Sequence, residues 1–388
     1  MWLVIQSFFV YGLIIFVMYS YGVVACRKTR SDSVVIHTKT SSKSIWNKYY
    51  FVIPIFIFSL FSALRENVGM DCPAYKKAFY ETLNFGQQTA VGGHEELFLL
   101  ILKLSSYISN YHYAFFFVFA FIQISFLYSA LKHDTRILPY FMLCLFAVGE
   151  YHSLMNGVRQ EIVACAFVFL VPWILNKKWV VFIIALVVLS AIHRSALILL
   201  PLGMSLFFLQ KKILKRNYQF IIIALCYVFM DKIDTSFLEN IFAFGGEHAG
   251  YETSSIEGYS QLEMTTKNFG FASWLRLLVY LFAIYYSPTF KKVFNYKLFN
   301  VYYNLFFINT ALFLLFYNNF TVNRLLYYTS IFVPIVLSML LFSTKNSKTK
   351  TGYYLYNLTL CLFLISITYL FYTVIDVPGE RVLYKFDF

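Results

Sequence analysis

Charged residues are scarce in this chain: only 13% of its 388 residues are charged, while 60% are hydrophobic. Soluble domains carry about 25% charged residues and alternate apolar with polar positions, so a soluble globular domain is excluded. Long apolar runs recur along the whole sequence, and 21% of the residues are aromatic, which suits helices that pack in lipid and anchor at its surfaces. The fold class that we predict is an all-α polytopic membrane protein.

Paired cysteines and the common nucleotide and metal motifs are missing as well. Of the six cysteines only Cys72 falls in a polar loop, and no C-x-x-C spacing occurs, so neither a disulfide framework nor a thiolate metal site is expected. The chain also has no G-x-x-x-x-G-K-[ST], no H-E-x-x-H and no G-x-S-x-G. These absences argue against an ATP-driven transporter, a zinc protease of that kind and a hydrolase nucleophile elbow. We expect no metal and no cofactor.

Basic residues are unevenly placed, and their placement predicts the topology. The formal net charge is +13, and basic residues gather in six clusters, at residues 27–48, 132–136, 177–178, 211–216, 291–297 and 345–350. Such clusters stay on the cytoplasmic side of a membrane. If all six do so, about 12 transmembrane helices result, with both termini outside. The net charge then records the direction of insertion, and no nucleic-acid partner is needed to explain it. We interpret residues 2–25 as a retained span and residues 1–388 as a single membrane domain.

The same placement fixes two segments, because an even number of crossings must separate any two clusters that both lie on the cytoplasmic side. Residues 179–209 must cross twice, as two short helices joined at His193 and Arg194, because Lys178 precedes them and Lys211 follows. Residues 96–109 must not cross, and we predict a re-entrant or interfacial helix on the outer face. The outer regions 65–111 and 232–270 are long, which is typical of lids and binding loops.

Five arginines fall at or just inside the outer ends of the predicted crossings: Arg65, Arg159, Arg194, Arg276 and Arg324. Charges at membrane depth are expensive and commonly functional. Guanidinium groups are permanently charged and fork-shaped, so several of them around one cavity suit a phosphate or pyrophosphate. The alternative is that each arginine pairs with a local carboxylate, for which Glu66, Glu150, Glu161 and Glu263 are available, or extends to the lipid headgroups.

His193 is a candidate general base, because an unperturbed imidazole exchanges protons near neutral pH. Its position at the tip of the predicted helical hairpin also allows a structural role, with the ring bonded to backbone carbonyls. His152 is a weaker candidate, and its place beside Tyr151 favours a structural role. In the first outer region, Asp71 and Glu95, with Tyr75 near them, are candidates for a general base or for binding sugar hydroxyls. Their alternative role is to order the loop, by pairing with Arg65 or by capping the helix that follows Glu95, and sugar binding or loop ordering is favoured over proton transfer.

The ordered motifs of this chain resemble those of the EpsG-like and Wzy-type bacterial polysaccharide polymerases. The resemblance lies in Leu64-Arg65 with Val68-Gly69-Met70-Asp71, in Glu95-Glu96-Leu97-Phe98, in Asn156-Gly157-Val158-Arg159-Gln160, in Ile192-His193-Arg194-Ser195, and in Asn323-Arg324 with Tyr327 and Tyr328. The chain departs from the family pattern at Met70, where threonine is common, and at Arg194, where a small or polar residue is usual.

The resemblance implies a lipid-carrier glycosyltransferase of GT-C-like architecture, acting at the outer face of the bacterial inner membrane without a metal. Its donor and acceptor would be glycans linked to undecaprenyl pyrophosphate, and its product an O-antigen of lipopolysaccharide, a capsule or another polysaccharide. A chain-length regulator protein is a further expected partner. On this basis His193, Arg159 and Arg324 are the expected catalytic residues, and Arg65, Asp71, Tyr75, Glu95, Arg194 and Arg276 the expected substrate-binding residues.

Two other functions are compatible with a polytopic chain of this kind. An O-antigen ligase performs the same chemistry with a different acceptor, but is expected to carry its arginine and histidine on one large periplasmic loop rather than on a helical hairpin. A flippase or transporter of lipid-linked glycan would line a path across the whole membrane with charges, whereas this chain gathers them at one face.

Overall fold

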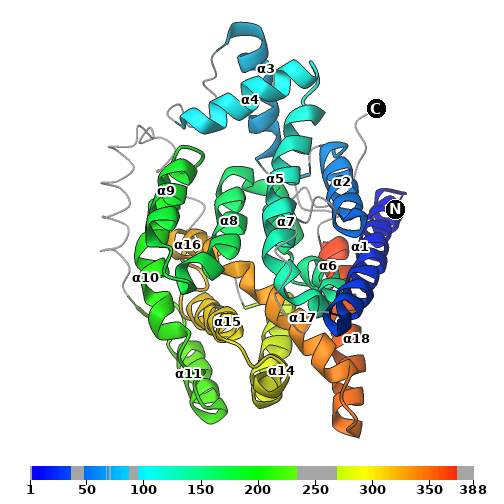
Figure 1. Ribbon diagram of the computed structural model, residues 1–388, viewed down its shortest axis with the longest axis vertical. Helices are drawn as coiled ribbons and strands as arrows, with labels where there is room; N and C mark the ends of the chain where they lie inside the picture. The colour runs from blue at the N-terminus through cyan, green and yellow to red at the C-terminus, as the bar shows by residue number, and fades with distance from the viewer. Residues whose placement is uncertain are drawn as a thin grey trace.

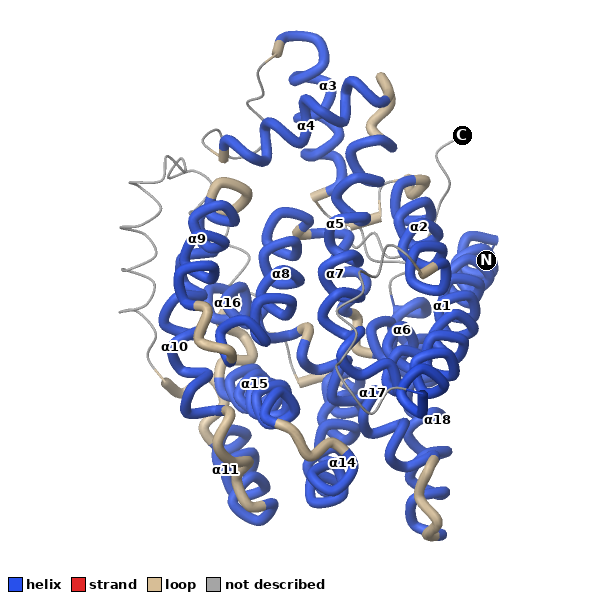
Figure 2. Tube along the Cα trace, viewed as in Figure 1, coloured by secondary structure: helices blue, strands red, loops and turns tan. Residues whose placement is uncertain are grey.

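The computed structural model describes residues 2–35, 48–66, 68–69, 71–86, 95–233 and 269–373. Within these ranges all regular structure is helical (Figure 2). The helices are α1 (Trp2–Val35), α2 (Tyr49–Ala63), α3 (Cys72–Phe85), α4 (Glu96–Ile108), α5 (Tyr113–Leu131), η2 (Lys132–Ile137), α6 (Leu138–Ala147), α7 (Glu150–Asn156), α8 (Val158–Leu175), α9 (Trp179–Ser190), η3 (Arg194–Ile198), α10 (Leu199–Leu209), α11 (Arg216–Val228), α14 (Phe271–Val293), α15 (Lys297–Leu315), α16 (Phe320–Ser330), α17 (Phe332–Lys345) and α18 (Lys350–Thr373).

Five described stretches are long and apolar enough to cross a membrane, namely Trp2–Thr29, Tyr113–Ala147, Val158–Leu175, Lys297–Leu315 and Lys350–Tyr369. A sixth is added if Val322–Ser330 and Phe332–Lys345, which meet at an angle of 42°, form one broken span. Shorter apolar helices cover Tyr49–Ala63, Trp179–Ser190 and Arg194–Leu209. These findings confirm an all-α polytopic membrane protein, while the count of 12 crossings stays a prediction.

The chain reverses direction within Tyr113–Ala147, at η2. Asp134 leaves the helical backbone there, with φ −143° and ψ 85°. Positions 29, 19 and 11 of α1 contact positions 135, 140 and 146, in that order, so α6 runs antiparallel to α1. The Tyr128 hydroxyl, near the end of α5, lies 3.7 Å from the sulfur of Met18. Helix α5 therefore arrives at the end of the molecule from which α6 leaves, and the basic cluster at residues 132–136 lies in a turn.

Residues 179–209 form the predicted helical hairpin. The rings of Trp179 and Phe207, near its open end, have centroids 4.9 Å apart. One turn further along, a Cβ atom on Gly203 would meet the Phe182 ring at 2.6 Å, so the two arms pack closely and antiparallel. His193 lies at the tip, between α9 and η3. The hairpin prediction is confirmed, and His193 and Arg194 are at its closed end.

The basic turns gather at one end of the bundle. The Arg136 guanidinium lies 4.6 Å from the centroid of the Phe294 ring, which joins the turn before α6 to the turn before α15. Lys345, at the end of α17, lies 5.7 Å from a ring centroid in the first turn of α6. The side-chain amide of Asn304 donates to the carbonyl of Lys212 at 3.0 Å. Clusters that are far apart in the sequence thus share one end of the structure.

Helices α3 and α4 lie at the opposite end. Figure 1 shows them above the upper ends of α8 and α9, while the connection between α17 and α18 is at the bottom of the view. Helix α4 runs across the view rather than along the bundle. Its Phe98 packs against Tyr75 of α3 and Phe115 of α5, with ring centroids 6.2 and 6.3 Å apart. The predicted helix at residues 96–109 is thus present as a peripheral helix, packed on one side.

Close packing of α1 on α6 makes Gly22 intolerant of a side chain. A Cβ atom there would lie 2.7 Å from the backbone nitrogen of Pro139, and backbone cannot move aside cheaply. We expect Gly22→Ala to destabilise the purified protein by about 1–3 kcal/mol, the usual effect of overpacking. Gly12→Ala on the same helix is the control, because nothing lies within 4 Å of its Cβ position. Thermal unfolding in detergent measures both, and equal midpoints for the two variants would contradict the packing argument.

Candidate active site

The tip of the hairpin is joined to the first turn of α4 through the backbone. The N–H groups of Leu97 and Phe98 donate to the carbonyl of Ala191 at 2.9 and 3.3 Å. The first N–H groups of a helix have no partner within the helix, so an external carbonyl stabilises the start of α4. This contact places Glu95, which directly precedes α4, beside His193.

Glu95 is the centre of the cluster. Its Oε1 atom lies 2.9 Å from Nδ1 of His193 and accepts the backbone N–H of Arg194 at 3.2 Å, while its Oε2 atom pairs with the Arg159 guanidinium. The Glu95 side chain is only 3% exposed. Burial alone raises the pKa of this carboxyl, but the hydrogen bond to His193 and the charge of Arg159 outweigh it and hold the pKa below its ordinary value. Glu95 is therefore an ionised acceptor at neutral pH.

A carboxylate at Nδ1 determines what His193 can do. A carboxylate only accepts hydrogen bonds, so Nδ1 must carry the proton, and Nε2 is the nitrogen that exchanges a proton with a ligand. The side chain of His193 is 17% exposed and is accessible at the edge of the cluster. This arrangement, in which a buried carboxylate orients an imidazole, is the one that general-base catalysis requires.

Arg159 is held between aromatic rings. Its guanidinium carbon lies 5.1 Å from the ring centroid of Phe98 and 6.0 Å from that of Tyr75. Its side chain is 13% exposed, and the charge is supported by Glu95 on one side and by ring faces on the other. Arg159 occupies the first turn of α8, after Gly157, so the start of α8 and the start of α4 meet at this residue.

Asp71 and Arg324 complete the accessible part of the cluster. The backbone N–H of Asp71 donates to Oδ1 of Asn156 at 2.9 Å, which anchors the outer region before α3 to the last residue of α7. Burial raises the pKa of the Asp71 carboxyl, and the nearby charges of Arg324 and Arg159 oppose that rise. The carbonyl of Arg324 accepts the Gln160 side-chain amide at 2.6 Å, which joins α16 to α8. The hydroxyls of Ser195 and Tyr328 are also hydrogen-bonded, joining η3 to α16.

Comparison with protein families identifies the chain. The model of the EpsG family matches residues 48–386. The chain belongs to the EpsG family. EpsG proteins are Wzy-like polysaccharide polymerases, so membership of the family implies a glycosyltransferase-type polymerase in a membrane. Comparison with curated proteins and with solved structures gave no match.

Two of the arginines predicted for the EpsG site lie apart from Glu95. Arg65 is 1% exposed, and its guanidinium donates to the carbonyls of Ser62 and Met155 at 2.7 and 2.9 Å. It also lies 4.3 Å from the Phe116 ring centroid. These are the contacts of a residue that fastens the end of α2 to α5 and α7. These contacts favour a structural role for Arg65 over contact with a substrate.

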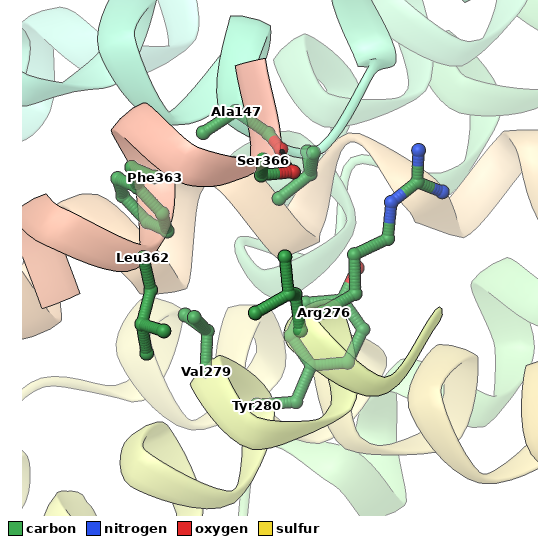
Figure 3. Close-up of a pocket in the computed structure, with 9 residues that line it drawn as sticks. Ala147, Arg276, Val279, Tyr280, Leu362, Phe363 and Ser366 are labelled. Carbon is green, nitrogen blue, oxygen red and sulfur yellow. Dashed lines mark hydrogen bonds between the residues drawn. The ribbon is translucent and has the colours of Figure 1, made fainter. Parts of the chain in front are cut away.

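Arg276 belongs to a second polar group in the bundle. In Figure 3 its side chain extends away from Leu362 and Phe363. A Cβ atom on Gly149, whose φ is +83°, would meet the Arg276 guanidinium at 2.9 Å, so this glycine leaves room for the side chain. Arg276 interacts electrostatically with Glu150, which accepts the Ser330 hydroxyl at 2.8 Å. Glu150 is thus close enough to act on the charge of Arg276, in keeping with a local carboxylate partner for this arginine.

Sequence reasoning named most of the cluster but not its connections. The motifs do not indicate that Glu95 contacts His193, and they favour sugar binding or loop ordering for Glu95. Nor do they indicate the hydrogen bond between Ser195 and Tyr328, although both residues lie in the motifs of the family resemblance. Nearly all of the outer region 232–270, including Glu263, lies outside the described residues, as do Asn67 and Met70.

Glu95→Gln keeps the shape of the side chain but removes the charge that supports Arg159 and orients His193. We expect polymer formation by the purified full-length protein to fall about 100-fold or more, the usual contribution of a positioned general base. The neighbouring exposed carboxylate gives the control, Glu96→Gln, which should change the rate less than about two-fold. Similar losses in both variants, measured as product chains per time, would contradict the role of Glu95.

The lowered pKa of Glu95 also predicts a pH dependence of stability. A carboxyl whose pKa is lower in the folded state contributes stability above its ordinary pKa of 4.5, and this stability is lost as the pH falls through the folded-state value. We expect the difference in unfolding temperature between the wild type and Glu95→Gln to be larger near neutral pH than at about pH 4. A difference between the wild type and Glu95→Gln that stays constant between the two pH values would refute the prediction.

Proposed function

We propose that this EpsG protein joins oligosaccharide repeat units carried on undecaprenyl pyrophosphate, at the outer face of the bacterial inner membrane, and releases undecaprenyl pyrophosphate. The observation that carries the proposal is the ionised Glu95 carboxylate, which contacts both His193 and Arg159. One carboxylate thus supports a proton acceptor and a permanent cation side by side. Glycosyl transfer from a pyrophosphate needs these two groups, one for the attacking hydroxyl and one for the leaving group.

In the proposed reaction His193 acts on the acceptor sugar. A hydroxyl of the acceptor repeat unit attacks the anomeric carbon of the donor glycan, and its proton passes to Nε2 of His193. The new glycosidic C–O bond forms as the bond between the anomeric carbon and the pyrophosphate oxygen breaks, and the electron pair leaves with undecaprenyl pyrophosphate. Glu95 holds the imidazole in the correct tautomer and stabilises the imidazolium that forms.

Arg159 and Arg324 are proposed to bind the pyrophosphate. Both act on the Asp71 carboxyl, so their charges lie near one another, and Arg324 has an exposed side chain. Guanidinium groups bind phosphate oxygens in a bidentate manner and stabilise the charge that develops on the leaving group. Because arginines supply this charge, we propose a metal-independent reaction. Arg194, which is half-buried at the hairpin tip, is a candidate for the same anion or for the glycan.

Asp71 and Tyr75 are assigned to the acceptor side. Asp71 is accessible and accepts hydrogen bonds, which suits sugar hydroxyls. Tyr75 is 3% exposed and lies against Arg159 and Phe98, so it supports the arginine from below rather than offering a large sugar-binding surface. Asp71 is thus proposed to give the acceptor a polar contact, while Tyr75 holds Arg159 in position.

The proposed orientation follows from the two ends of the bundle. Basic turns share one end, as the contacts of Arg136, Lys345 and Lys212 show, and cytoplasmic ends carry basic residues. His193 lies at the opposite end of a hairpin whose open end leads into Lys211. We propose twelve crossings of GT-C-like architecture with the Glu95 cluster facing outward, where lipid-linked repeat units are exposed for polymerisation.

The test is polymerisation by the full-length protein in vesicles that contain a lipid-linked repeat unit. We expect Arg324→Ala to reduce the rate about 100- to 1000-fold, as removal of a group that stabilises a developing negative charge does. Arg216→Ala is the control, because this half-buried arginine lies over the Tyr285 ring at the basic end and should change the rate less than about two-fold. Arg324→Lys should recover little, since an ammonium cannot bind two oxygens as a fork.

Three outcomes would separate this proposal from its alternatives. If the Arg159→Ala and His193→Ala variants both produce the normal distribution of polymer lengths, the roles assigned to these two residues are wrong. Transfer of the glycan to a lipopolysaccharide core, with no growth of the repeat-unit chain, would identify an O-antigen ligase. Movement of labelled repeat units across the vesicle membrane without a new glycosidic bond would identify a flippase.

A further inference from the structure

Helix α4 has two apolar sides, and only one of them packs against the part of the chain that the structure describes. Its buried residues are Phe98, Leu102 and Ser105, and the Phe98 ring packs against rings of α3 and α5. On the far side, spaced three or four residues apart, Leu100, Leu104, Tyr107 and Ile108 are exposed by 48%, 52%, 74% and 70%. We call these four residues the outer stripe of α4.

The length and position of α4 limit what can cover the outer stripe. The helix has 13 residues and is therefore about 20 Å long, too short for a membrane crossing of about 20 residues. It lies across the end of the bundle that carries Glu95, not along the bundle (Figure 1). A short helix in this position, with an apolar side directed away from the protein, has the geometry of an interfacial helix.

The apolar surface next to α4 is that of the hairpin. Ile184, Val187 and Val188 of α9 are exposed by 58%, 59% and 50%, as expected for side chains that face lipid in a membrane protein. Val188 is less than one turn from Ala191, whose carbonyl accepts the N–H of Leu97 at 2.9 Å. The lipid-facing surface of α9 thus leads to the start of α4.

The residues that flank the outer stripe fit the boundary between acyl chains and headgroups. Tyr107 lies within it and Tyr111 follows α4, exposed by 63%, and tyrosines are enriched at this boundary. Lys103 is exposed on the flank of the helix, where an ammonium reaches phosphate groups. Membrane lipid therefore fits this side of α4 in both polarity and arrangement.

We propose that the outer stripe of α4 lies among the acyl chains of the outer leaflet and so fixes the depth of Glu95 and His193 relative to the membrane surface. Glu95 directly precedes α4, and His193 is joined to Glu95, so the depth of the helix sets the depth of both side chains. The choice of leaflet rests on the proposed function. A lipid-linked pyrophosphate lies at headgroup depth, and α4 would present the cluster at that level.

The experiment is site-specific photocrosslinking of the full-length protein in vesicles of phosphatidylethanolamine and phosphatidylglycerol. Leu104, Ile108, Lys103 and Ile184 are each replaced in turn by p-benzoylphenylalanine, and phospholipid adducts are counted by mass spectrometry. We expect adducts at Leu104 and Ile108 to equal those at Ile184 and to exceed those at Lys103 about five-fold, because Lys103 points to the polar flank of the same helix.

Equal adduct yields at Leu104 and Lys103 would overturn the inference, and so would crosslinks from Leu104 and Ile108 to a second copy of the chain. The crosslinking result does not depend on polymerase activity. A protein that does not polymerise repeat units can still show the expected lipid adducts, so failure of the proposed function is distinguishable from failure of this inference. In an active preparation, Leu104→Glu combined with Ile108→Glu should slow polymerisation at least about ten-fold, while Lys103→Glu should have an effect of less than about two-fold.

Discussion

A buried carboxylate is stable only when donors surround it, and the donors of Glu95 come from other elements of the bundle. Arg159 comes from the start of α8, while His193 and the N–H of Arg194 come from the hairpin tip. The Glu95 carboxylate is the shared acceptor of all three contacts. Its two oxygens therefore position both the start of α8 and the hairpin tip. The peripheral helix α4, which follows Glu95, is thereby fixed against the bundle without crossing it.

Features that depend on local charge and apolar length were predictable from the sequence. The hairpin at residues 179–209 is predicted because Lys178 and Lys211 flank one apolar stretch and both belong on the cytoplasmic side. The stretch must therefore cross twice, as two short helices. The peripheral position of residues 96–109 followed from the same parity. The structure agrees on both, because the placement of lysine relative to apolar runs reflects the cost of moving charge across lipid.

Features that depend on contacts between distant residues were not predictable in this way. Glu95 and His193 are 98 positions apart, and nothing in either motif states that one orients the other. Arg65 and Arg276 carry the same charge as Arg159 and stand in similar sequence surroundings. Only the structure distinguishes them. The Arg65 guanidinium donates hydrogen bonds to backbone carbonyls, and Arg276 interacts electrostatically with Glu150. Local sequence indicates that a charge is costly but not which neighbour relieves the cost.

The bond between the Ser195 and Tyr328 hydroxyls has a consequence for movement within the site. Ser195 is two residues beyond His193, and Tyr328 is one helical turn beyond Arg324, so this pair of hydroxyls joins the proposed proton acceptor to the proposed anion-binding arginine. A movement of the hairpin relative to α16 would therefore break this bond. An enzyme that repeats one reaction on an ever longer chain gains from such coupling, because the spacing between attacking and leaving groups stays the same in every cycle.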